Sequence, residues 1–115
     1  MKGIRIKNSD VFLELIEKPM HPKLKEMLVW FMGKRDILFT CGYEKRDYDS
    51  VHDVDPLQGV DIRSWIYKDP KKVEDEINNA WVYDPDRPNK KVAIYHNSGR
   101  GKHIHLQACD NTIKA

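Results

Sequence analysis

The sequence predicts an α+β fold in which two or three helices pack on a small antiparallel sheet. Two stretches repeat apolar residues with the period of a helix, and four short runs have the β-branched and aromatic composition of strands. The last two runs are joined only by the glycine-containing segment His96–Lys102. A parallel crossover needs about a dozen residues or more, so we expect these two strands to be antiparallel, with the helices on one face of the sheet.

The clearest helix is predicted for Pro22–Met32, where apolar residues recur at i, i+3, i+4 and i+7 and Gly33 is a natural stop. A second helix is expected to begin with Asp69 as N-cap and Pro70 at its first position. Its apolar stripe consists of Val73, Ile77, Ala80 and Trp81. A short helix is also expected within Asn8–Lys18.

The strand-like runs are Ile37–Cys41, Gly59–Trp65, Lys91–Tyr95 and His103–Cys109. Side chains alternate across a strand, so His103, His105 and Gln107 should share one face of the last strand. The apolar residues between them should face the core. Both histidines can therefore point into a cleft.

Composition indicates one globular domain spanning residues 1–115, with 40% hydrophobic and 33% charged residues. The formal net charge is +2 and charges of both signs are interleaved, so nucleic acid is not an expected partner. No run approaches the roughly 18 apolar residues of a membrane span, and the first residues lack a signal-peptide core. We expect synthesis in the cytoplasm without Sec export. Cys41 and Cys109 lie far apart and are expected to be reduced and buried.

Three short segments supply an imidazole, a carboxylate and a second imidazole, which is the ligand set of a catalytic zinc site. They are Ser50–His52, Gly59–Ile62 and His103–Gln107. Three such ligands leave the fourth position of Zn²⁺ open for water. Each segment taken alone has a simpler explanation: an exposed histidine pair on a strand, a salt bridge between Asp61 and Arg63, or an ordinary loop histidine at position 52.

The order of these motifs resembles the zinc D-alanyl-D-alanine carboxypeptidase family, which includes phage L-alanyl-D-glutamate endopeptidases. The similarity covers roughly Ile37 to Gln107: a Thr-Cys-Gly-Tyr turn ending at Tyr43, then Ser-Val-His, then Gly-Val-Asp-Ile, then a strand with His-x-His. It implies zinc bound by His52, Asp61 and His105 on the small α+β fold shared with the hedgehog N-terminal domain.

The chain departs from the family pattern in several places. The spacing between the first histidine and the aspartate is two residues longer, which predicts a bulge around Pro56. Glu44 replaces the arginine that is implied to hold the substrate's carboxylate, so Lys45 and Arg46, with Tyr43, become the substrate-binding candidates. Lys102 stands where many members carry an acidic base. The chain is also shorter than typical members and lacks their wall-binding module.

Some branches of the family have a catalytic first histidine in His-x-His, which makes His103 the catalytic candidate. The resemblance implies a zinc peptidase that acts on peptidoglycan peptides and reaches the cell wall by phage lysis or within a virion. Asp49, Asp53, Asp55 and His96 are candidates for orienting a ligating imidazole. The alternative is a catalytically silent metal-binding relative that serves as a phage structural or binding module. A weaker similarity to lysostaphin-like endopeptidases lacks their histidine at the position of Leu57.

Overall fold

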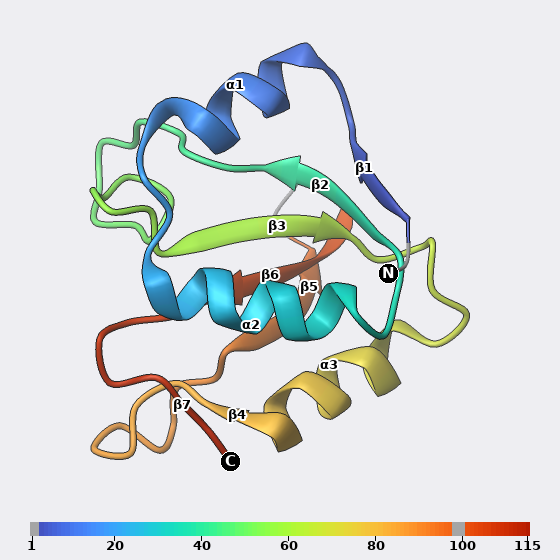
Figure 1. Ribbon diagram of the computed structural model, residues 1–115, viewed down its shortest axis with the longest axis vertical. Helices are drawn as coiled ribbons and strands as arrows, with labels where there is room; N and C mark the ends of the chain where they lie inside the picture. Colours follow the sequence, from blue (N-terminus) through green and yellow to red (C-terminus); the bar gives the residue numbers. More distant parts are fainter. Residues whose placement is uncertain (1–2, 98–100) are drawn as a thin grey trace.

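The computed structural model describes residues 3–97 and 101–115 (Figure 1). Its helices are α1 (Ser9–Glu17), α2 (Pro22–Met32) and α3 (Pro70–Ala80). Its strands are β1 (Ile4–Ile6), β2 (Ile37–Cys41), β3 (Gly59–Arg63), β4 (Trp81–Val82), β5 (Ala93–Asn97), β6 (Lys102–Gln107) and β7 (Ile113–Lys114). The expected α+β class is confirmed.

Five strands form the main sheet in the order β1-β2-β3-β6-β5, and β4 pairs with β7 separately. The antiparallel pairing of β5 with β6 is confirmed. The expectation of a wholly antiparallel sheet is wrong, because β1 pairs with β2 in parallel. The three residues of β1 are too few to show an alternating pattern, and this strand was not expected. The hedgehog-like arrangement remains a prediction.

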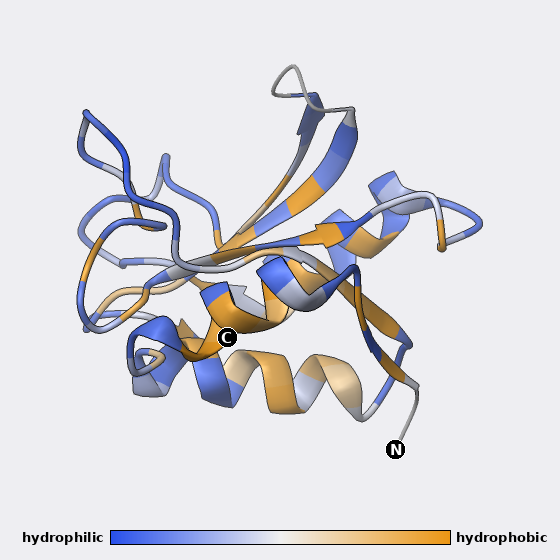
Figure 2. Ribbon diagram, turned by 90° about the horizontal axis from the view of Figure 1, so that it is seen from above, coloured by the Kyte–Doolittle hydropathy of each residue, from blue (hydrophilic) through white to orange (hydrophobic). Residues whose placement is uncertain are grey.

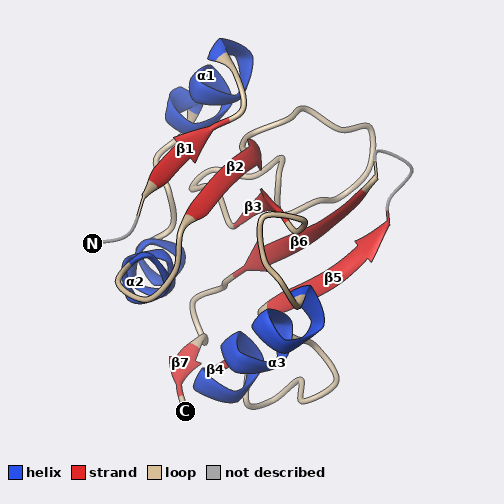
Figure 3. Cartoon of the chain, turned by 90° about the vertical axis from the view of Figure 1, so that its right-hand side faces the viewer, coloured by secondary structure: helices blue, strands red, loops and turns tan. Residues whose placement is uncertain are grey.

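The core lies between the sheet and the helices α2 and α3, which Figure 3 shows on the same side of the sheet. Leu24 and Phe31 from α2 and Ile77 from α3 meet Ile62 and Ile104 from the central strands, and all five are essentially inaccessible to solvent. In Figure 2 hydrophobic residues recur along these helices, whereas the long connecting loops are mostly hydrophilic. Helix α1 contacts β1 and β2, far from α3.

The ends of α2 coincide with those expected from the sequence. The start of this helix is fixed by His21, whose Nδ1 accepts a hydrogen bond of 3.0 Å from the backbone N–H of Lys23. The Nε2 of the same buried ring lies 2.6 Å from Oδ1 of Asp110. The ring of His21 therefore ties the segment after β6 to the first turn of α2.

Helix α3 begins as expected, with the Asp69 side chain accepting from the N–H of Lys72 at 3.3 Å. It ends at Ala80, so Trp81 belongs to β4 and not to the helix. The strand β3 ends at Arg63 and not at Trp65, whose side chain is 70% exposed. Strand β5 runs from Ala93 to Asn97, two residues later than expected.

Side chains of α3 form hydrogen bonds with backbone groups of the edge strand β5. The amide of Asn78 donates to the carbonyl of Ala93 at 2.9 Å and accepts from its N–H at 3.0 Å. The carboxylate of Glu74 accepts from the N–H of Tyr95 at 2.6 Å and from Nζ of Lys71 at 2.6 Å. Helix α3 is therefore attached to the sheet by hydrogen bonds as well as by apolar contacts.

Candidate metal centre

The pairing of β3 with β6 places the predicted site residues side by side. Asp61 lies directly opposite His105, and Arg63 lies directly opposite His103. Residues two apart share a strand face, so all four side chains project from the same face, opposite the core residues Ile62 and Ile104. The alternation expected for the last strand is confirmed.

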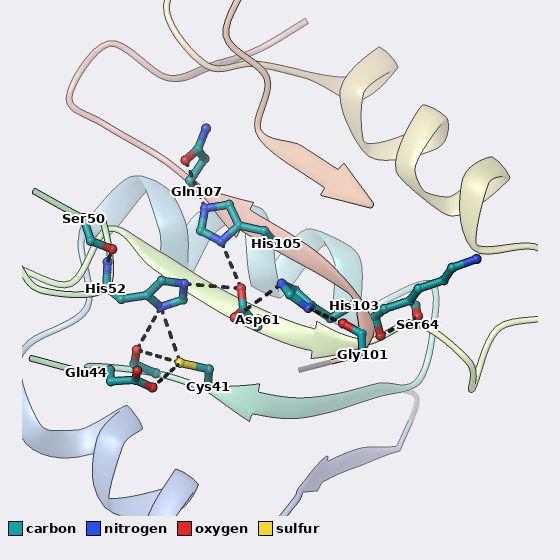
Figure 4. A network of polar contacts seen from close by, with 12 residues as sticks. Cys41, Glu44, Ser50, His52, Asp61, Ser64, Gly101, His103, His105 and Gln107 are labelled. Carbon is teal, nitrogen blue, oxygen red and sulfur yellow. Dashed lines mark hydrogen bonds and ion pairs between the residues drawn. The ribbon is translucent and has the colours of Figure 1, made fainter. Parts of the chain in front are cut away.

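The carboxylate of Asp61 is the centre of a cluster of three histidines (Figure 4). Its Oδ1 lies 2.9 Å from Nδ1 of His105 and 3.3 Å from Nε2 of His52. Its Oδ2 lies 3.6 Å from Nε2 of His103. The structure thus brings together the three proposed zinc ligands and the proposed catalytic histidine.

The loop between β2 and β3 folds back to deliver His52. The carbonyl of His52 accepts from the N–H of Glu44 at 2.9 Å, and the carbonyl of Val51 accepts from the N–H of Gln58 at 3.2 Å. The loop then packs on Gly59: a Cβ added there would lie 2.4 Å from Cγ2 of Val51. Glycine at the start of β3 therefore permits the close approach that places the His52 ring over Asp61.

The second nitrogen of each proposed ligand ring is bound to a protein oxygen. Nδ1 of His52 lies 3.0 Å from the carbonyl oxygen of Gly42, so it carries the proton and donates. Nε2 of His105 lies 3.0 Å from Oε1 of Gln107. The Gln107 amide is oriented by its own donation to the carbonyl of Lys91 at 2.8 Å, which leaves its oxygen facing His105.

The contacts of His52 with Gly42 and of His105 with Gln107 determine which ring nitrogens are left facing Asp61. A neutral imidazole has one N–H, so the nitrogens of His52 and His105 that face Oδ1 carry lone pairs when both rings are neutral. Two lone pairs directed at one carboxylate oxygen repel it unless a cation lies among them. Each facing nitrogen therefore either carries a proton and donates to Asp61, or shares a metal ion with it.

The electrostatics favour an ionised carboxylate at this position. Burial acts to raise the pKa of Asp61, but His105 and His52 outweigh it when their facing nitrogens carry protons, and they hold the pKa well below its usual range by hydrogen bonds and by charge. Asp61 is therefore a charged acceptor at neutral pH, as a metal ligand must be.

Cys41 also lies at this cluster, a position that was not expected from the sequence. A register shift between Phe39 and Cys41 places the thiol opposite Asp61, and its Sγ lies 3.7 Å from Nδ1 of His52. Cys41, His52 and Asp61 offer ligand atoms within 4.8 Å of one another, so this buried group could hold a metal ion. Burial raises the pKa of the Cys41 thiol well above its usual range, and the charges of Asp61 and Glu44 raise it further.

His96 extends the cluster onto β5. It pairs with His103 across the strands, and the two ring centroids are 4.6 Å apart. Burial lowers the pKa of His96, and the neighbouring His103 and His105 lower it further. In the described part of the chain, neither His96 nor the loop aspartates at positions 49, 53 and 55 hydrogen-bond to the rings of His52 or His105. The groups that orient those rings are the Gly42 carbonyl and Gln107.

Of the three substrate-binding candidates, Arg46 alone lines the pocket of about 520 Å³ that contains the four site residues. The Tyr43 ring instead lies under Nζ of Lys18, which is 5.3 Å from the ring centroid, and its hydroxyl hydrogen-bonds to Asp53. The side chain of Lys45 is exposed to solvent. Tyr43 and Lys45 are not part of this pocket lining.

The chain was compared with known proteins at three levels. No protein family, curated protein or solved structure matches it. No helix in residues 3–97 and 101–115 has the length and apolar character needed to cross a membrane.

Three of the groups that shape this site differ in how far the sequence indicates them. The backbone carbonyl of Gly42 has no sequence signal, since every residue carries one. Gln107 did have a signal: it follows His103 and His105 at the same strand phase, and a side-chain amide beside a ligating histidine is a common orienting group. The bulge that brings Cys41 opposite Asp61 likewise has no sequence signature.

Proposed function

We propose that this protein is a zinc-dependent peptidase that hydrolyses peptide bonds of peptidoglycan. The proposal is supported by the ordered motifs that resemble the zinc D-alanyl-D-alanine carboxypeptidase family and by the cluster around Asp61. The observation that carries it is that His52 and His105 each direct one ring nitrogen at the same oxygen of Asp61 while their other nitrogens lie at hydrogen-bonding distance from protein oxygens.

Two of the donor separations, those that Asp61 makes with His52 and with His105, are close to the spacing around a small tetrahedral ion. Ligand atoms about 2.0–2.1 Å from a tetrahedral zinc are roughly 3.3 Å from one another. Oδ1 of Asp61 lies 3.3 Å from Nε2 of His52 and 2.9 Å from Nδ1 of His105. Two neutral imidazole nitrogens and one carboxylate oxygen are donors that suit zinc. A tetrahedral zinc ion held by these three ligands keeps its fourth coordination position for water or substrate.

Zinc bound by these three residues supplies an acidic water and polarises a carbonyl group. His103 is placed differently from the two proposed ligands. Its Nε2 lies 3.6 Å from Oδ2 of Asp61, the oxygen that does not face His52 and His105, and its Nδ1 lies 3.3 Å from the carbonyl oxygen of Gly101. A ring held there can take a proton on Nε2 and pass it to the leaving amine. Arg46 lies on the wall of the same pocket and is paired with Glu44 and Tyr48.

Cys41 provides a competing ligand set with His52 and Asp61. Two observations favour His105 over Cys41. The thiol is nearest to Nδ1 of His52, the nitrogen that donates to Gly42, and not to the nitrogen that faces Asp61. Burial and the nearby carboxylates also disfavour the thiolate, which is the form of cysteine that binds metal.

A second candidate function is a metal-binding relative without catalysis, and two positions favour it. Glu44 occupies the place of the family's substrate-binding arginine, and its carboxylate lies 3.2 Å from Nε of Arg46. Lys102 occupies the place of an acidic base. These departures affect turnover and not the three proposed ligands.

Metal analysis of the purified protein tests the ligand set. We expect close to one zinc per chain in wild type and in Cys41→Ser, and a large loss in His52→Ala and in His105→Ala. Circular dichroism spectra verify that each variant is folded. Zinc that survives both histidine substitutions, or that is lost from Cys41→Ser alone, contradicts the ligand assignment.

Hydrolysis of purified peptidoglycan, followed by mass spectrometry of the released peptides, tests the activity. We expect new amino and carboxyl termini with wild type and a loss of at least about 100-fold in rate with His103→Ala, the lower end of the contribution of a general acid–base residue. The His103→Ala variant should keep its zinc. If zinc-loaded wild type releases no peptide, the silent metal-binding function is the correct one.

A further inference from the structure

A second pocket, of about 360 Å³, adjoins the proposed zinc site on the side away from Arg46. It shares Asp61 and His103 with the first pocket, so the two cavities meet at the cluster of histidines. Its remaining lining residues are Lys7, Thr40, Cys41, Arg63, Trp65, Gly101 and Lys102. A peptide lying across the site would therefore have one part in each pocket.

The lining of this second pocket is predominantly positively charged. Three cations line it: Lys7 directly follows β1, Arg63 ends β3, and Lys102 begins β6. Of the described residues that line the pocket, Asp61 is the only one with an acidic side chain, and it faces the three histidines. In the parts of the chain that the structure describes, no carboxylate forms an ion pair with any of these three cations.

Arg63 is the best placed of the three. It lies directly opposite His103 and two residues from Asp61 on the same strand face. Its guanidinium lies over the ring of Trp65, 4.9 Å from the centroid. Stacking on an aromatic face leaves the N–H groups at the edge of a guanidinium free to bind a planar anion with two hydrogen bonds.

The first residue of β6, Lys102, is fixed next to Arg63 by a hydrogen bond to its backbone carbonyl. The hydroxyl of Ser64, which is buried, donates to the carbonyl of Lys102 at 3.1 Å. Nζ of Lys102 lies 6.0 Å from the ring centroid of Tyr95. The two cations are thus carried by neighbouring strands whose separation is fixed by pairing, and not by independent loops.

We propose that the pocket formed by Lys7, Arg63 and Lys102 binds a carboxylate of the peptide substrate, one that lies within about two residues of the bond to be cleaved. This inference rests on the proposed function and specifies its substrate. It also explains how a peptide acid can be bound although Glu44 occupies the position of the family's arginine: the positive charge is supplied from the opposite side of Asp61.

The distance limit follows from strand geometry. Two residues along β3 separate Asp61 from Arg63, which is about 6.6–6.8 Å along the strand. An extended peptide advances about 3.3–3.6 Å per residue, so a carboxylate at Arg63 belongs to a residue one or two positions from a carbonyl at the zinc site. A terminal carboxylate and an acidic side chain near the cleaved bond both meet this condition.

Trp65 emission offers a direct readout, because the indole lies under the guanidinium that would bind the anion. The zinc-loaded protein is titrated with N-acetyl-D-alanyl-D-alanine and with its C-terminal amide, and the emission change is recorded within seconds of mixing. We expect the acid to bind at least about tenfold more tightly than the amide, which is the effect of one charged hydrogen bond. Trp65→Phe should abolish the emission change and so assign it.

Charge variants then test the residues. Arg63→Gln should remove most of the preference for the acid, Lys102→Gln should reduce it, and Arg63→Lys should restore part of it. Lys25→Gln, an exposed lysine on α2, is the matched control and should leave the preference intact. Equal binding of acid and amide, or an unchanged preference in Arg63→Gln, overturns the inference whether or not the peptide is hydrolysed. Selective binding of the acid without hydrolysis contradicts only the peptidase activity.

Discussion

The Nδ1 atom of His105 lies 2.9 Å from Oδ1 of Asp61, and the two residues are direct cross-strand partners in β6 and β3. Backbone pairing on both sides fixes the separation of their Cα atoms. Sites built on strands hold their geometry more closely than sites on loops. The less constrained member of the proposed ligand set is His52, which depends on a loop folded back over Gly59.

Metal removal should lower the thermal stability of the protein. A ligand that binds only the native state at 100 times its dissociation constant stabilises by about 2.7 kcal/mol, which corresponds to roughly 10 °C for a domain of this size. We expect a chelator to lower the midpoint of thermal unfolding of wild type by about this amount. The His105→Ala variant should melt at the same temperature with and without chelator, and a wild type insensitive to chelation would contradict metal binding.

Gly59→Ala should weaken metal binding by displacing the loop that carries His52. The new methyl group would lie 2.4 Å from Cγ2 of Val51 and 3.2 Å from Cε1 of His105. Overpacking of this kind costs about 1–3 kcal/mol of stability. We expect a lower unfolding midpoint and at least a tenfold loss of zinc affinity, measured by competition with a chromogenic chelator. Adding Val51→Ala removes the closest clashing atom and should recover part of both losses.

Glu74→Ala should destabilise the attachment of α3 to β5. The buried carboxylate accepts from the N–H of Tyr95 at 2.6 Å, and its removal leaves that group without its partner. The expected loss in the free energy of unfolding is about 1–3 kcal/mol, measured by urea denaturation. Asp75→Asn, which alters a more exposed contact to the same Lys71, should change stability by less than about 0.5 kcal/mol. Equal effects of the two substitutions would contradict the role of Glu74.

Asp84 should make folding sensitive to acid. A hydrogen bond from the N–H of Asp86 lowers the pKa of this carboxyl, and the side chains of Arg87 and Asn111 lower it further. A pKa below its unfolded value of about 3.9 stabilises the protein above that pH. This contribution is lost as the pH falls towards the lower folded value.

Asp84→Asn should accordingly lower the urea midpoint at pH 7 and have a smaller effect at about pH 3, below the pKa of this carboxyl in the unfolded chain, where part of the contribution is already lost. Asp86→Asn keeps the backbone donor to Asp84 and serves as the control. If Asp84→Asn lowers stability equally at both pH values, ionisation of this carboxyl does not contribute.

Local sequence signals predicted the helices and the central strands well. The apolar repeat and the flanking Gly33 gave both ends of α2, and the Asp69-Pro70 pair gave the start of α3. These signals act over a few residues and need no knowledge of the rest of the chain. Strand β1 has only three residues and draws its stability from pairing with β2, so no local pattern marks it.

The proposed ligands were found because their residue types and order are distinctive, but the groups that orient them depend on the folded chain. The Gly42 carbonyl reaches His52 because the backbone of residue 42 runs against α1, where an added Cβ would lie 2.8 Å from backbone atoms of Glu14 and Leu15. The cationic pocket joins residues from β3 and β6 with one that follows β1, positions separated by up to 95 residues in sequence. Neither arrangement is encoded in a short motif.

The hydrogen bonds from α3 to β5 determine how an extended chain can approach the sheet. An open edge strand offers its unpaired N–H and C=O groups as a template for another strand, either from a bound peptide or from a second, aggregating molecule. Here Asn78 imitates a neighbouring strand by bonding both backbone groups of Ala93, and Glu74 takes the N–H of Tyr95. These three backbone groups of β5 are therefore closed to β-augmentation, so a peptide bound beside Ala93 would have to be recognised by side chains and not by backbone pairing there.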